Sequence, residues 1–146
     1  MKPAIVMISA ALVVACSVTE PVPGPGTFTI DGLVVPPPAA LPGTAYEPVF
    51  RVTGQAGAAV IEGSFWGSAC GDRVDPEFLV AAGTALLRLS FVVLVESPQC
   101  LQQIVITEYT AVFTDLEPGS YRVAVEYDLQ RAGTVRRFSA GNVELR

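Results

Sequence analysis

The chain has 146 residues, enough for one domain and a tail, and its 9 basic and 14 acidic residues give a formal net charge of −5. It contains no histidine, which excludes catalytic arrangements that pair a serine or a cysteine with a histidine base. Lys2 is its only lysine, and an acidic chain with so few cations argues against binding to nucleic acid.

The first sixteen residues begin with one basic side chain and continue as an apolar run. Residues 4–15 contain no charge, and the run ends at Leu12-Val13-Val14-Ala15-Cys16. A basic start, a short apolar core and small residues before a cleavage site are typical of a secretory signal. Twelve uncharged residues are too few to cross a hydrocarbon core of about 30 Å, which needs about 20 residues. We therefore expect residues 1–15 to be a signal peptide.

The ending Leu-x-x-Ala-Cys resembles the lipobox of bacterial lipoproteins. The resemblance implies that a lipid is attached to the sulfur of Cys16 and that a signal peptidase cleaves before this residue. It also implies an exported protein that the lipid holds at a membrane of the cell envelope. Ser17 stands where lipoproteins retained at an inner membrane typically have aspartate, which implies the outer membrane if the organism has two. Plain secretion, with Cys16 present by chance, is the alternative.

A segment rich in proline and glycine follows the lipobox. Residues 17–26 read Ser-Val-Thr-Glu-Pro-Val-Pro-Gly-Pro-Gly, a composition that excludes a helix or a central strand. We expect residues 16–26, which start with the lipidated cysteine, to form a flexible linker that spans at most about 30 Å. Residues 27–146 are then expected to form one domain.

The rest of the chain consists of short apolar stretches separated by turn residues. Strands are predicted over Thr27–Val35, Pro48–Thr53, Ala58–Trp66, Thr84–Glu96, Gln103–Phe113, Tyr121–Leu129 and Thr134–Leu145. A bulge is predicted at Gly63 and a kink at Ala140-Gly141, while residues 36–43 and 67–83 are predicted as irregular segments. No stretch is long enough to be a crossover helix. The predicted fold class is therefore all-β, an antiparallel sandwich of about seven strands.

The stretch Leu116-Glu117-Pro118-Gly119-Ser120-Tyr121 resembles the tyrosine corner of immunoglobulin-like (Ig-like) and fibronectin type III domains. The resemblance implies an Ig-like sandwich in which Tyr121 is a buried corner residue with its hydroxyl bonded to backbone near the turn. Trp66 is a weaker match to the tryptophan that Ig-like domains have on their strand C. Val123 stands where an antibody-type domain has its second cysteine, so the likeness is to bacterial Ig-like domains. The same pattern occurs in transthyretin-like and carboxypeptidase-regulatory sandwiches, and the topology stays open.

One acidic cluster and one aromatic set are the candidate binding sites. Asp72, Asp75 and Glu77 lie close together in a predicted loop, but their spacing differs from that of a calcium-binding loop. We expect a solvated loop there, and calcium binding stays open. The aromatic set is Trp66, Tyr46 and Tyr109, which could form a platform for a glycan or a partner protein. Packing in the core is the commoner fate of strand aromatics.

These patterns point to a non-enzymatic, lipid-anchored envelope protein. Its Ig-like module is expected to serve structural, adhesive or protein-assembly interactions, with another envelope protein as the partner. We expect no catalytic residue, cofactor or metal, and Arg136-Arg137, the one basic pair, is expected to decorate the last strand. The alternative is a ligand-binding module, either a glycan binder or a protease inhibitor with residues 67–77 as its wedge.

Two cysteines remain once Cys16 carries a lipid, and exported proteins form disulfides. Because no histidine is present to share a metal or activate a thiolate, we predict a disulfide between Cys70 and Cys100. On the chain-entropy model this bond stabilises the fold by about 3–4 kcal/mol. Mass spectrometry of peptides prepared without reductant should find the two cysteines linked. Two free thiols would contradict the prediction.

Overall fold

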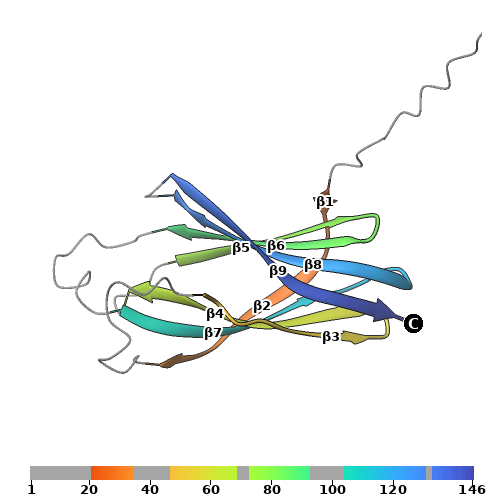
Figure 1. The fold of residues 1–146 in the computed structure, drawn as a ribbon, viewed down its shortest axis with the longest axis horizontal. Coiled ribbons are helices and arrows are strands. Elements are labelled where there is room, and N and C mark those ends of the chain that lie inside the picture. Colours follow the sequence, from red (N-terminus) through yellow and green to blue (C-terminus); the bar gives the residue numbers. More distant parts are fainter. Residues whose placement is uncertain (1–20, 35–46, 69–72, 93–103, 131–132) are drawn as a thin grey trace, which may run out of the picture.

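The computed structural model describes residues 21–34, 47–68, 73–92, 104–130 and 133–146, which form two β-sheets packed face to face (Figure 1). The all-β prediction is confirmed, since these residues contain strands and no helix. The five-stranded sheet has the order β1-β5-β6-β8-β9 and the four-stranded sheet has the order β2-β7-β4-β3. The strands are β1 (Val22–Pro23), β2 (Gly26–Val34), β3 (Arg51–Gln55), β4 (Ala58–Ser68), β5 (Arg73–Ala81), β6 (Thr84–Val92), β7 (Ile104–Phe113), β8 (Gly119–Leu129) and β9 (Thr134–Leu145).

Strand β5 lies in the segment that was predicted to be irregular. It pairs with β6 over its whole length, from Arg73 opposite Val92 to Ala81 opposite Thr84. Pro76 argued against a strand, because proline cannot donate a ladder hydrogen bond. β1 covers only the far end of β5, at Leu79 and Val80, so the proline lies where β5 is an edge strand. An edge position tolerates the missing donor, and this explains the wrong prediction.

One strand pair departs from the predicted antiparallel arrangement. β6 and β8 are parallel, with Thr84 opposite Arg122 and Ser90 opposite Asp128. The reason lies in the chain path, since β7, which separates them in sequence, belongs to the other sheet. The chain crosses to the four-stranded sheet, runs back along β7 and returns beside β6 in the same direction as β6.

The chain enters the sandwich before the predicted domain start. β1 pairs with Leu79 and Val80 at the edge of the five-stranded sheet. The N–H of Gly24 donates to the carbonyl of Phe78 at 2.8 Å, and β2 then pairs with β7 in the other sheet. Residues 21–26 were expected within the linker. They lie along the sandwich and carry the chain from one sheet to the other.

A polar contact crosses the otherwise apolar core. The hydroxyl of Tyr127 on β8 donates to the carbonyl of Ser64 on β4 at 2.7 Å and lies 3.5 Å from the hydroxyl of Tyr109. Tyr109 is only 1% exposed, so the aromatic platform is wrong for this residue and the core alternative is confirmed. Trp66 is half-buried on β4, and Tyr46 lies outside the described residues.

Tyr121, the predicted corner residue, is buried at the start of β8, opposite Val143 of β9. The turn before it is held to the neighbouring hairpin, since the N–H of Leu116 donates to the carbonyl of Gly57 at 3.0 Å. The hydrogen bond from the Tyr121 hydroxyl to backbone near this turn stays a prediction.

The three cysteines, Cys16, Cys70 and Cys100, lie outside the described residues. The strand ends that flank residues 69–72 and 93–103 are paired with one another, Ser68 with Ile104 and Arg73 with Val92. Cys70 and Cys100 lie between these strand ends, outside the described residues, and the disulfide between them stays a prediction.

The two predicted irregularities have different outcomes. The kink at Ala140-Gly141 is confirmed, because the β8–β9 register shifts between Val123 and Ala124. The bulge at Gly63 is wrong, since β4 and β7 pair there without a shift. Gly63 instead leaves room for a neighbour. A Cβ at this position would lie 2.6 Å from the Tyr109 hydroxyl oxygen.

We predict that Gly63→Ala lowers the free energy of unfolding by about 1–3 kcal/mol, because the added methyl overpacks the buried Tyr109 ring. Gly67→Ala in the same strand is the matched control, since its Cβ would lie 3.5 Å from Phe65, an ordinary contact. Urea denaturation should give a lower midpoint for Gly63→Ala and an unchanged or higher one for Gly67→Ala. Equal midpoints for the two variants would contradict the packing argument.

Candidate functional site

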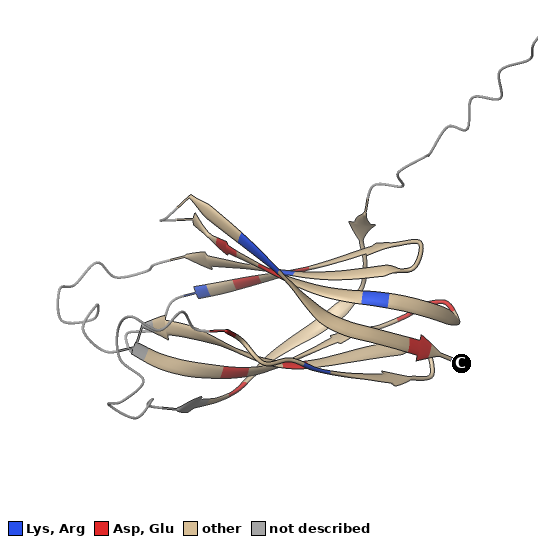
Figure 2. Cartoon of the chain, in the orientation of Figure 1, with Lys and Arg blue, Asp and Glu red and all other residues tan. Residues whose placement is uncertain are grey.

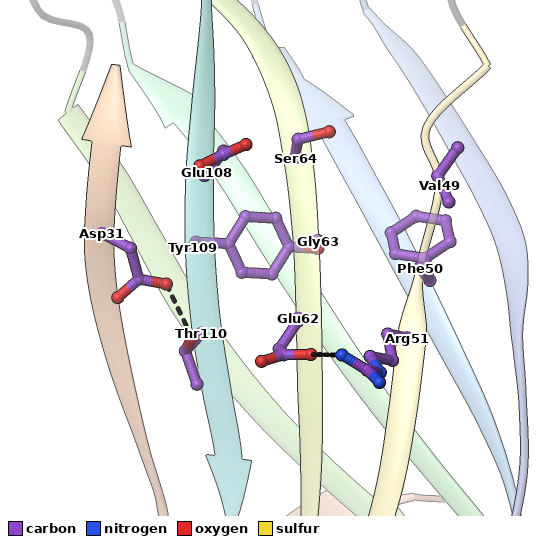
Figure 3. A pocket seen from close by; sticks show the side chains of 10 residues that line it. All are labelled: Asp31, Val49, Phe50, Arg51, Glu62, Gly63, Ser64, Glu108, Tyr109 and Thr110. Atoms are coloured by element: carbon purple, nitrogen blue, oxygen red, sulfur yellow. Dashed lines mark hydrogen bonds and ion pairs between the residues drawn. The ribbon is translucent and has the colours of Figure 1, made fainter. Parts of the chain in front are cut away.

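A hollow of about 400 Å³ lies on the outer face of the four-stranded sheet (Figure 3). Each strand of the sheet contributes one charged residue to its lining: Asp31 from β2, Glu108 from β7, Glu62 from β4 and Arg51 from β3. The lining therefore contains three carboxylates and one guanidinium group. We call this site the acidic hollow.

Strand alternation explains why these side chains share the outer face. Along β7, Tyr109 is buried in the core while Glu108 is exposed, as expected for a strand with one face against the other sheet. The cross-strand partners of Glu108 are two small residues, Ser64 on β4 and Gly32 on β2. The sheet surface is therefore hollowed beside Glu108. In β2 the register shifts between Ile30 and Gly32, at Asp31.

Some charged groups of the acidic hollow form hydrogen bonds or ion pairs with neighbouring residues, and one forms no ion pair within the described residues. The hydroxyl of Thr110 donates to a carboxylate oxygen of Asp31 at 2.6 Å, and Arg51 lies 3.7 Å from Glu62 (Figure 3). Both members of the Arg51–Glu62 pair are more than half exposed, so solvent screening makes the pair weak. Glu108 forms no ion pair with another residue of the described ranges. Its carboxylate is available to a cationic group.

The acidic hollow also has an apolar rim. Val49, in the segment before β3, is 80% exposed, and the neighbouring Phe50 is half-buried against the core. In the described part of the chain no three acidic or cysteine side chains lie close enough together to hold a metal ion. The site can therefore contact a side chain that carries both an apolar stem and a positive charge, such as lysine or arginine.

The acidic cluster predicted as a loop lies on strand β5, as far as the structure describes it. Asp75 is 2.9 Å from Arg73, and Glu77 is 3.0 Å from Arg88. The Arg88 guanidinium also donates to Glu126 on β8 at 2.7 Å, and this hydrogen bond raises the pKa of Arg88. These carboxylates are engaged by arginines along the face of a sheet. The third member, Asp72, lies outside the described residues.

A second hollow, of about 430 Å³, lies on the five-stranded sheet. Its lining includes Arg122 and Ala124 on β8, Arg137 and Ser139 on β9, and Thr84 on β6. We call it the basic hollow. Figure 2 shows that acidic and basic positions occur on both sheets, so the net negative charge of the chain does not exclude a local basic site. From the sequence, Arg137 was expected to decorate the last strand, and no pattern indicated a binding role for Arg122.

Comparison with protein-family models, with curated proteins and with solved structures finds no significant match. Among the described strands and turns there is no helix of the length and apolar character that a membrane crossing requires.

Proposed function

We propose that this protein is a non-enzymatic, lipid-anchored module of the cell envelope that binds a partner protein through the acidic hollow. The observation that carries the proposal is the spacing between the lipobox and the fold. Cys16 precedes Pro23, which already pairs with β5, by seven residues. Seven extended residues reach about 25 Å at most, so a lipid on Cys16 would hold the sandwich beside the bilayer.

The shape of the molecule supports binding over catalysis. The acidic hollow lies on an open sheet face, and two of its three carboxylates are engaged by Arg51 and Thr110. The sequence offers no histidine to act as a general base beside them. We also propose an Ig-like relationship for the domain. The two packed sheets and the buried Tyr121 after the Pro118-Gly119 turn support it.

The composition of the acidic hollow indicates its occupant. Glu108 offers a carboxylate that no described residue neutralises, and the exposed Val49 offers an apolar contact beside it. A segment of an envelope protein with basic and apolar side chains matches both features. The glycan-binding alternative is weakened, because Tyr109 is buried in the core and cannot contact a sugar. The protease-inhibitor alternative is weakened as well, because residues 73–77, which were expected to form part of an inhibitory loop, belong to strand β5.

The anchor is tested by changing its attachment point. We predict that Cys16→Ser moves the protein from the membrane fraction to the soluble fraction, because several acyl chains worth about 0.8 kcal/mol per CH₂ are lost. Cys70→Ser is the matched control and should stay with the membrane. Fractionation followed by immunoblotting measures the distribution. Equal retention of Cys16→Ser and the wild type would contradict the anchor.

The partner site is tested by photo-crosslinking in cells. A photoreactive amino acid in place of Val49 should give a discrete adduct with another envelope protein. The control is the same substitution at Val135 on β9, which is also exposed but lies on the other sheet. The Val49 adduct should become weaker when Glu108 is changed to Gln. Adducts of equal yield at both positions, or none at Val49, would contradict the proposed surface.

A further inference from the structure

We propose that the basic hollow on the five-stranded sheet binds a phosphate group. Arg122 and Arg137 come from adjacent antiparallel strands and line the same hollow. Ala124, two residues after Arg122 on β8, also lines it, and its small side chain packs with Leu79 and Leu86. The lining thus combines two arginines with the apolar residues Ala124 and Phe138, which reduce the access of water to charged hydrogen bonds formed there.

The two arginines are unpaired within the described residues. Neither forms an ion pair there, although acidic residues lie nearby. Glu126 stands opposite Arg137 in the β8–β9 register, but its carboxylate accepts the hydrogen bond from Arg88. Glu144, near Arg122 on β9, accepts a hydrogen bond from Ser120. Glu126 and Glu144 therefore have other hydrogen-bond partners, and neither guanidinium group forms an ion pair that would compete with a ligand within the described residues.

The donor set favours phosphate over a carboxylate. Each guanidinium presents a planar fork of N–H donors, and Thr84 and Ser139 add hydroxyl groups from β6 and β9. The lining thus offers donors from three adjacent strands, and a phosphate group with three or four oxygens can accept from more of them than a carboxylate with two. The volume of about 430 Å³ leaves room for the rest of a phosphate ester.

The position of the basic hollow indicates where such a phosphate would come from. Pro23, Leu79, Leu86, Ala124 and Ser139 form one row across the five-stranded sheet. At about 4.8 Å per strand, the row places the hollow, which spans β6 to β9, about 10–19 Å from β1, through which the chain arrives from Cys16. A phospholipid headgroup is therefore the first source, and free or polymer-bound phosphate is the second. The choice of lipid rests on the proposed anchor, but phosphate binding does not.

The experiment uses the full lipidated chain in a non-ionic detergent without phosphate. Calorimetric titrations with inorganic phosphate and with a soluble short-chain phosphatidylglycerol form its two arms. Arg122→Gln and Arg137→Gln should each weaken binding about tenfold, the usual loss for one charged hydrogen-bonding group. Arg136→Gln is the matched control, because Arg136 neighbours Arg137 in sequence but is not among the residues that line the hollow. It should change the affinity less than twofold, and all variants should unfold at the wild-type temperature.

Each result assigns or rejects the site. Binding of both probes, weakened about tenfold in Arg122→Gln and in Arg137→Gln, supports a headgroup site. Binding of inorganic phosphate alone supports a site for free or polymer-bound phosphate. No binding of either probe overturns the proposal, and so does an equal loss in Arg136→Gln. Unlipidated Cys16→Ser protein should bind inorganic phosphate as the wild type does, so failure of the anchor and failure of this site are distinguishable.

Discussion

The hydrogen bond from the Tyr127 hydroxyl to the carbonyl of Ser64 joins the two sheets through an apolar core. A buried hydroxyl needs a partner, so this bond restricts how β8 can lie over β4. It also requires space for the adjoining Tyr109 ring, which Gly63 provides. The side chain of Ser64 lines the acidic hollow on the outer face (Figure 3). The core contact and the outer site therefore share one stretch of β4, and a change in the core would alter the surface.

The path of the chain separates two surfaces of opposite charge. Because β2, β7, β4 and β3 form one sheet, Asp31, Glu62 and Glu108 meet on its outer face. The parallel pairing of β6 with β8 brings Thr84 beside Arg122, and the β8–β9 hairpin adds Arg137 on the other sheet. The two sheets that carry the acidic and basic hollows are opposite layers of the sandwich (Figure 1).

Alternation of apolar and polar residues predicted most of the strands, because each strand has one face in the core. It failed for β5, where Pro76 and the charged residues beside it concealed Val74 and Phe78, both packed in the core. It could not predict the parallel pair, since alternation is the same for either strand direction. Alternation also could not predict either hollow. Their residues are distant in sequence. Only the sheet order and register place Asp31 near Glu108, and only the pairing of β8 with β9 allows Arg122 and Arg137, which do not stand opposite each other, to line one hollow.

If the lipid anchor and the phosphate site act together, they would orient the domain as well as tether it. An anionic membrane attracts a basic residue near its surface by about 1 kcal/mol, so Arg122 and Arg137 contribute about 2 kcal/mol. The same field repels carboxylates, and Glu77, Glu126 and Glu144 lie on the same sheet as the two arginines. General attraction to an anionic surface is therefore offset on this sheet, and the orientation depends on phosphate bound in the basic hollow. The acidic hollow, on the other sheet, would then face away from the lipid, where a partner protein can reach it.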